Sequence, residues 1–389
     1  MVSLMHTTTT RSLRILFVTR HIYRDGTTAH IQGLGKALID RGHLVAVAGG
    51  NRLQRAPHEL TSLGIAVHEI EFPNVVHPRS VIKAMKAAGA VRKLIGSFAP
   101  DIIHVHMRST SIYALGARVL AGVPFVSTIH ATGIPTDGPL GRLSFWGSRA
   151  IAISEETECD LRERFKVSEN RIRRIVHGVD EGRFCRPTSD ERLAARAQLG
   201  IDRNAFVVSM VSRLDRVKRH DLLLRATAQL IDRFPNVRVV IAGSGELAGE
   251  LKVMTAHYRL EPHVQFVGHL DPVGVYWASD ISVSASDSEG FPYNVIESMM
   301  CGVPVIRTPA GGHRDQIQDG VDGVIVPFDD HQALAAAIER LIGDRRRLDA
   351  IAEAALASAR ARFSLSVMAT KTEAVYFEAL SSLRKRDTR

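Results

Sequence analysis

Short apolar stretches alternate with helical patterns along nearly the whole chain, and they do so in two consecutive series. The first series runs from Arg14 to Ile153, and the second begins after Pro187 and ends near Val326. Apolar runs of this length, separated by helical segments, are typical of parallel β-strands joined by crossover helices. The alternation predicts an α/β protein with two doubly wound, Rossmann-like domains that face each other across a cleft. The expected strands cover residues 14–19, 43–48, 65–70, 101–106, 124–129, 150–153, 206–211, 237–241, 264–267, 281–285, 304–306 and 323–326.

The two series also set the expected domain boundaries. An N-terminal Rossmann-like domain covers residues 1–185, and a C-terminal Rossmann-like domain covers residues 186–365. Residues 366–389 form a last helix with a basic tail. A chain of 389 residues is long enough for two domains of ordinary size, each with its own apolar core.

No part of the sequence suggests export or a membrane span. No apolar run reaches the roughly 18–20 residues that a spanning helix needs, and the Thr-rich first 14 residues lack the apolar segment of a signal peptide. The three cysteines, Cys159, Cys185 and Cys301, are scattered and lack the spacing of a metal site or a disulfide framework. We therefore expect a cytoplasmic protein with reduced thiols.

The net charge of +9 is compatible with several kinds of partner. Basic proteins attract nucleic acids, anionic membranes and phosphorylated small molecules. The basic residues are dispersed with few aromatic residues between them, and no nucleic-acid-binding motif occurs, so we expect no nucleic-acid partner. A helical pattern over residues 79–98 is compatible with weak peripheral membrane contact or with a solvated helix face, because it carries Lys83, Lys86, Arg92 and Lys93.

The most specific pattern in the chain is Glu289-Gly-Phe-Pro-Tyr-Asn-Val-Ile-Glu297, followed by Ser-Met-Met-Cys-Gly-Val-Pro. An apolar strand pattern precedes it, and Pro292 suits the first position of a helix. Glu289 and Gly290 then lie at the amino end of that helix, where unpaired N–H groups attract anions. Carboxylates accept hydrogen bonds from vicinal hydroxyls, so two of them around an anion site indicate a nucleotide-sugar. Two unrelated glutamates on one helix are the alternative.

This motif resembles the signature of the retaining glycosyltransferases of the GT-B fold, in particular glycosyltransferase family 4 (glycosyl transferases group 1). The family pattern is E-G-F-x-x-x-x-x-E-x-M-x-x-G-x-P-V, and the stretch from Glu289 to Val305 matches each defined position. The resemblance implies a hexosyltransferase that moves a sugar from a nucleotide-sugar, with UDP favoured, to an acceptor hydroxyl. It also implies an acceptor-side first domain, a donor-binding second domain and a last helix that crosses back to the first domain.

Arg213 and Lys218 follow a predicted strand, five residues apart. A planar guanidinium and a compact ammonium can together hold a diphosphate, although two solvated loop cations are the alternative. The family has an Arg and a Lys at this spacing against the donor diphosphate. The resemblance therefore implies that both residues stabilise the leaving nucleotide, without a metal ion or other cofactor.

The resemblance extends to further positions. It makes His130, at the end of a predicted strand, the candidate for orienting the reacting hydroxyl, and it assigns the ribose to Glu297 and the transferred sugar to Glu289. At His177 the family has asparagine, and near Gly26 it has a pair of glycines. By resemblance, the catalytic set is His130, Arg213, Lys218 and Glu289, and the donor-binding set is Gly26, Gly243, Gly268, Gly290, Phe291, Pro292, Asn294, Val295 and Glu297.

Some alternatives stay open at this point. A nucleotide-sugar epimerase of the same fold, or a non-catalytic nucleotide-sugar-binding relative, would share much of this pattern. The acceptor is a lipid-linked glycan, a polysaccharide or a small metabolite. The sequence has no D-x-D metal signature, and its Cys and His spacings predict no zinc site.

Overall fold

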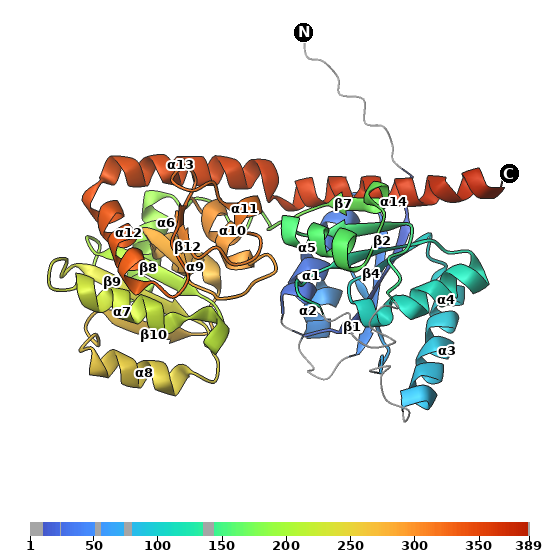
Figure 1. Cartoon of the computed structure of the whole chain (residues 1–389), viewed down its shortest axis with the longest axis horizontal. Coiled ribbons are helices and arrows are strands. Elements are labelled where there is room, and N and C mark those ends of the chain that lie inside the picture. Colours follow the sequence, from blue (N-terminus) through green and yellow to red (C-terminus); the bar gives the residue numbers. More distant parts are fainter. Residues whose placement is uncertain (1–10, 24, 51–55, 74–79, 135–143, 388–389) are drawn as a thin grey trace, which may run out of the picture.

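The computed structural model describes residues 11–23, 25–50, 56–73, 80–134 and 144–387, and the first ten of the 14 Thr-rich N-terminal residues lie outside them. Two parallel β-sheets, each covered by helices, lie side by side (Figure 1). The expected fold class, α/β with two doubly wound domains, is confirmed. No helix of the described residues is long and apolar enough to cross a membrane.

The first sheet has seven strands in the order β3-β2-β1-β4-β5-β6-β7. Every pair of neighbours is parallel, so each connection crosses over the sheet. The strands are β1 (Arg14–His21), β2 (Leu44–Gly50), β3 (Ala66–Glu69), β4 (Ile102–Val105), β5 (Phe125–Ile129), β6 (Arg149–Ala152) and β7 (Ile172–Arg174). The helices are α1 (Gly26–Ile39), α2 (Ala56–Ser62), α3 (Val81–Phe98), α4 (Ser111–Ala121) and α5 (Glu155–Cys159).

The second sheet has six parallel strands in the order β10-β9-β8-β11-β12-β13. Its strands are β8 (Phe206–Val211), β9 (Val237–Ala242), β10 (Val264–Gly268), β11 (Ile281–Ser284), β12 (Val305–Arg307) and β13 (Val324–Ile325). Its helices are α6 (Ser189–Gln198), α7 (His220–Leu230), α8 (Ala248–His257), α9 (Pro272–Ala278), α10 (Tyr293–Met300), α11 (His313–Gln316), α12 (His331–Gly343) and α13 (Arg345–Arg362).

Both sheets reverse their strand order beside their first strand, at β1 and at β8. Ligands of doubly wound sheets bind at the carboxyl ends of the strands near this reversal. The predicted boundary between residues 185 and 186 falls in the connection from β7 to β8. Residues 14–19 and 281–285, predicted from their apolar runs, correspond to β1 and β11 within two residues at each end.

The helix α10 differs in one detail from the prediction. Pro292 does not occupy its first position but precedes it in an extended conformation, and the helix begins at Tyr293. Extended backbone is compatible with the fixed φ of proline, so Pro292 ends the loop instead of starting the helix. Gly302 lies just beyond the helix in the left-handed region, with φ 71°, as expected for a glycine that terminates a helix.

The last helix, α14 (Leu365–Asp387), continues from α13 and lies along the first domain, whereas α13 lies along the second (Figure 1). It packs against α1, and Glu373 of α14 bonds to Arg41 and His43, which follow α1 in the sequence. The backbone N–H of Leu13 donates to His43 Nδ1 (3.1 Å), so the Nε2 of this buried ring carries the proton and donates to Glu373 (3.0 Å). Arg41 donates to the same carboxylate (3.0 Å).

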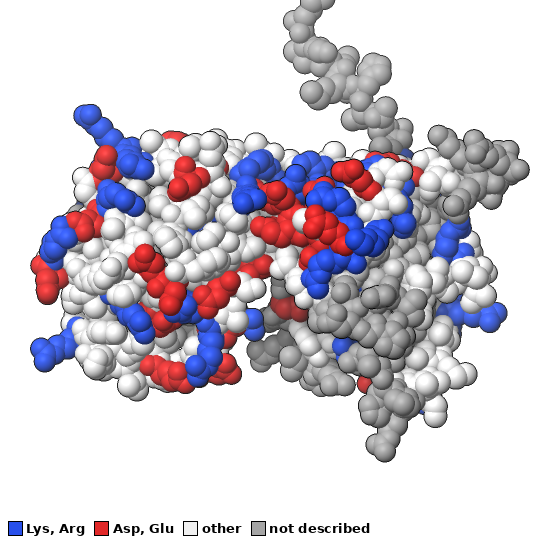
Figure 2. Space-filling view, viewed as in Figure 1, with Lys and Arg blue, Asp and Glu red and all other residues white. Residues whose placement is uncertain are grey.

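A second set of contacts joins the domains through charged side chains. Charges of both signs gather over the junction, near α5 and α11 (Figure 2). Asp315 of α11 accepts from the backbone N–H of Glu155 (2.7 Å) and pairs with Arg174 (3.1 Å). The carboxylate of Glu156 accepts from the backbone N–H of Gly312 (3.1 Å). These contacts run from the end of the first sheet directly to the second domain.

We predict that Glu373→Ala lowers the melting temperature by several degrees, because it leaves His43 and Arg41 without their shared acceptor. The loss of a buried, charge-assisted partner costs about 1–3 kcal/mol. Asp349→Ala is the matched control, since it removes an ion pair with Arg345 whose side chains are 70% and 56% exposed. Such a pair contributes roughly 0–1 kcal/mol. Equal melting temperatures of the two variants, measured by circular dichroism, would contradict the role of Glu373.

Candidate functional site

A cavity of about 740 Å³ lies between the two domains, and both contribute to its lining. It brings together most of the residues that the sequence singled out. Gly243, Gly268, Val295 and Glu297 do not line it. The lining residues are Asp25, Gly26, Thr27, His130, Ala131, His177, Val211, Ser212, Arg213, Lys218, Glu289, Gly290, Phe291, Pro292, Tyr293 and Asn294.

The wall of this cavity includes a close backbone contact between the domains. A Cβ atom at Gly290 would lie 2.7 Å from the carbonyl oxygen of His130, closer than real Cβ atoms come. Beside it, the ring of His177 stacks on Tyr293, with centroids 4.7 Å apart and planes inclined by 14°. His177 also meets the edge of Phe291 (5.5 Å between centroids). Glycine at position 290 therefore allows the motif loop to reach the end of β5.

Two helix N-termini contribute to the cavity. Gly26 is the first residue of α1, and the Asp25 side chain caps this helix by accepting from the N–H of Thr28 (2.8 Å). The loop before α10 contributes Gly290, Phe291 and Pro292. The N-termini of helices carry partial positive charge and free N–H groups, so both suit an anionic ligand. A Cβ atom at Gly26 would meet nothing within 4 Å, so no contact of this structure requires a glycine there.

Lys218 and Glu289 form an ion pair inside the cavity, and their side chains are only 16% and 12% exposed. Lys218 ends a short 3-10 turn that Asp215 caps, and the backbone N–H of Lys218 donates to the Asp215 carboxylate (3.2 Å). Arg213, in contrast, is 78% exposed and pairs with Asp215 at 3.0 Å. Lys218 is thus held in place, whereas Arg213 can turn toward an anion in the cavity.

Glu297 lies on α10, partly buried behind the lining residues. The hydroxyl of Tyr276 donates to it (3.1 Å), and burial raises the pKa of Glu297 to about 7. Its neighbour Asn294 donates through its side-chain amide to the carbonyl of Val211 (3.1 Å), which ties α10 to the end of β8. A buried carboxylate with one donor has further lone pairs to offer to ligand hydroxyls.

Of the other three predicted donor residues, two glycines shape the backbone and one valine belongs to the core. Gly243 has φ 146°, and a Cβ atom there would lie 1.9 Å from the carbonyl oxygen of Ser212. Its N–H donates to the carbonyl of Gly268 (2.7 Å), so the ends of β9 and β10 are joined at these two glycines. Val295 is completely buried and packs in the core beneath α10. Their contribution to ligand binding stays a prediction.

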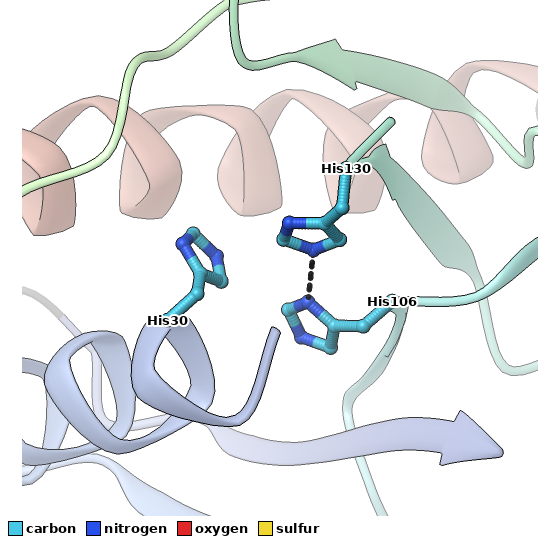
Figure 3. Close-up of side chains that lie close together, drawn as sticks. All are labelled: His30, His106 and His130. Atoms are coloured by element: carbon cyan, nitrogen blue, oxygen red, sulfur yellow. Dashed lines mark hydrogen bonds between the residues drawn. The ribbon is translucent and has the colours of Figure 1, made fainter. Parts of the chain in front are cut away.

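Five histidines form a cluster on the first-domain side of the cavity: His30, His104, His106, His130 and His177. His106 Nδ1 lies 3.2 Å from His130 Nε2 (Figure 3). Burial holds the pKa of His130 well below its usual range, so the ring is neutral and can accept or donate one hydrogen bond. Three residues of the cavity lining were not predicted as site residues: His177, Tyr293 and Asp25. The one sequence signal for any of them was that His177 replaces the asparagine of the family.

The comparisons with known proteins agree with this geometry. The chain matches the family described as "Glycosyl transferases group 1" over residues 191–357 and "Glycosyltransferase Family 4" over residues 24–183. It is 30% identical to the D-inositol 3-phosphate glycosyltransferase of Saccharomonospora viridis, over 73% of this chain and 71% of that protein. The chain belongs to the group 1 glycosyltransferases. It is an enzyme of this class, and the expected family is confirmed.

Two further relatives extend the similarity of this glycosyltransferase to nearly its whole length. An uncharacterized glycosyltransferase of Methanocaldococcus jannaschii, MJ1607, is 25% identical over 92% of this chain and 95% of that protein. The crystal structure of Anabaena Alr3699/HepE in complex with UDP superimposes with a TM-score of 0.80 at 23% identity, over 95% and 99% of the two chains. At this identity the second similarity establishes the GT-B fold alone.

We predict that the two motif glutamates of this glycosyltransferase separate by function. Glu297→Gln should weaken free nucleotide and full donor alike, because Glu297 is expected to bind the ribose that both contain. Glu289→Gln should not weaken free nucleotide, since the change frees Lys218 from its ion pair, but it should lower kcat/KM for transfer. Calorimetry and steady-state kinetics on both variants check this. Equal losses of nucleotide affinity would contradict the division.

Proposed function

We propose that the protein transfers a hexosyl group from a UDP-sugar to an acceptor hydroxyl with retention of anomeric configuration, in the cytoplasm and without a metal ion. The observation that carries the proposal is the cavity between the domains. It combines Arg213, Lys218 and two helix N-termini with the carboxylate of Glu289. A diphosphate fits the cations and the N–H groups, and sugar hydroxyls fit the carboxylate.

The cations give the leaving group its stabilisation in this proposal. Lys218 exchanges Glu289 for the diphosphate when the donor binds, and Arg213 turns in from its exposed position. Glu289 is then free to accept hydrogen bonds from the transferred sugar. The two positive charges at the leaving oxygen then do the work that a divalent cation performs in other sites.

We propose that the anomeric configuration is retained because the acceptor attacks the face of the sugar from which the diphosphate departs. The carboxylates that line the cavity are Asp25, which caps α1, and Glu289, which in this proposal binds hydroxyls of the transferred sugar, so neither is assigned as a nucleophile. The bond from the anomeric carbon to the diphosphate breaks, and the acceptor oxygen bonds to the same face. The acceptor proton passes to the departing phosphate, and neutral His130 orients the acceptor hydroxyl.

The donor and the acceptor are proposed from relatives. Structures of Alr3699/HepE were solved with UDP and with UDP-glucose, which supports UDP as the nucleotide. Several relatives carry the name D-inositol 3-phosphate glycosyltransferase, which makes a phosphorylated polyol one acceptor to test beside glycans. A cytoplasmic location is supported by the three free cysteines, Cys159, Cys185 and Cys301.

The test is a calorimetric titration with UDP-, GDP-, ADP- and TDP-glucose in the presence of a chelator. We expect the UDP-sugar to bind most tightly, and Lys218→Ala to weaken it by roughly 10- to 150-fold, which is about 1.5–3 kcal/mol for a charge-assisted contact. Lys252→Ala, at an exposed position on α8, is the control. A strict need for added metal, or tighter binding of another nucleotide, would contradict the proposal. Incubation of the donor without acceptor tests for epimerase activity, and none is expected.

A further inference from the structure

Three histidines from separate elements bring their ring nitrogens together beside the cavity (Figure 3). His30 comes from α1, His106 follows β4 and His130 follows β5. One ring nitrogen from each lies within 4.8 Å of the others, and His30 and His106 are only 3% and 2% exposed. The spacing of these residues in the sequence matches no metal motif, because the sheet order and not the local sequence brings them together.

The rings have the electronic state of metal ligands. Burial lowers the pKa of His30 to about 3 and holds that of His106 well below its usual range, so both are neutral. The Nδ1 of His30 already bonds His177 (3.0 Å), whereas its buried Nε2 has no hydrogen-bond partner among the described residues. An ion held between His106 Nδ1 and His130 Nε2 would give this nitrogen a partner.

We propose that His30, His106 and His130 bind a divalent transition metal ion of the Zn²⁺ class. Three imidazoles with an open fourth position are an established zinc geometry, with Zn–N distances of about 2.0–2.1 Å. Small rotations of the rings suffice, since the His106–His130 nitrogens are already 3.2 Å apart. The metal takes the place of the proton shared by these two rings, and the site lies beside the cavity that His130 lines.

Metal binding at this site inhibits transfer, because a coordinated His130 cannot orient the acceptor. The inhibition rests on the proposed function, whereas the binding itself does not. The ion is therefore an inhibitory ligand and not a cofactor. Two results are expected together: a chelator does not lower the activity of the enzyme, and zinc lowers it.

The binding test uses chelator-treated, full-length protein titrated with ZnCl₂ in a calorimeter and with Co²⁺ in a spectrophotometer. We expect one tight site per chain and the visible absorption bands of tetrahedral Co²⁺, with no response to Mg²⁺. His30→Asn should weaken zinc by roughly tenfold or more, which is about 1.4 kcal/mol. His104→Asn is the matched control, since the ring nitrogens of His104 already bond Tyr376 and Thr128, each at 2.7 Å.

The outcomes separate the two parts of the inference. Equal zinc affinity of wild type and His30→Asn would mean that other histidines bind the ion, and this would overturn the site. Tight binding that His30 controls, combined with unchanged transfer, would overturn the inhibition and keep the site. If no UDP-sugar binds in the donor titration while zinc binds as expected, the proposed function is contradicted and the metal site is not. Circular dichroism melting of both variants verifies that they are folded.

A separate observation concerns the outer face of the first domain. Helices α3 and α4 enclose an apolar groove of about 670 Å³. Apolar side chains at its rim are strongly exposed: Met85 by 70%, Leu120 by 77% and the adjacent Val119 by 73%. Exposed apolar surface of this kind often marks a binding site for a protein or a membrane.

The charges beside the groove favour one kind of partner. Helix α3 carries Lys86, Arg92 and Lys93, as well as Lys83, which pairs with Glu71 (3.3 Å). Helix α4 carries Arg118, and neither helix has an acidic residue. Two copies that met through this face would bring like charges together. We infer that the face docks on an anionic lipid membrane, with the apolar rim entering the interface and the cations meeting lipid phosphates.

The test is co-sedimentation with vesicles of phosphatidylcholine, alone or mixed with phosphatidylglycerol. We expect binding to the mixed vesicles that weakens with added salt, and a loss of roughly tenfold or more for Val119→Ser combined with Leu120→Ser. Val253→Ser on α8 is the control, because its side chain is similarly exposed (71%) but lies outside the groove. Equal binding of wild type and the double variant, or a dimer in lipid-free light scattering that the double variant abolishes, would overturn the inference.

Discussion

The close approach of Gly290 to the backbone of His130 is the constraint on which the rest of the site depends. Only a residue without a side chain lets the motif loop of the second domain reach the end of β5 in the first, where a Cβ atom would lie 2.7 Å from a carbonyl oxygen. The stack of His177 on Tyr293 lies beside this contact. In the connection from β7 to β8, the N–H of Val179 donates to the carbonyl of Phe363 (2.8 Å), which lies between α13 and α14. These contacts hold the two domains together along one edge of the cavity, and the cavity depends on them.

The charges of the cavity are balanced before any ligand enters. Lys218 neutralises Glu289 in a site that is largely out of solvent, and an unpaired charge there would be costly. In the proposed mechanism a diphosphate replaces Glu289 as the partner of Lys218, and hydroxyl groups of the sugar become the partners of the released carboxylate. Arg213 stays outside, paired with Asp215, until an anion attracts it. The same ion pair thus stabilises the empty site and prepares both residues for the donor.

Features that depend on local sequence pattern could be predicted from the sequence, whereas features that depend on tertiary structure could not. Apolar runs placed most strands, because buried parallel strands need them, and the motif from Glu289 to Glu297 located the cavity. The short strand β7 was missed, since its three residues include Arg173 and Arg174 and give no apolar run. The histidine cluster was missed because its members are far apart in the sequence. Only the adjacency of β1, β4 and β5 in the sheet brings them together.

The most direct test of this account is the affinity for UDP of two glycine-to-alanine variants, measured by calorimetry. Gly290→Ala adds a methyl group against the carbonyl oxygen of His130, whereas Gly249→Ala on α8 adds one where nothing lies within 4 Å. The account predicts that Gly290→Ala stays folded and loses roughly tenfold or more in affinity, and that Gly249→Ala binds like the wild type. Unchanged UDP affinity in Gly290→Ala would show that the site does not depend on this contact, and it would contradict the account.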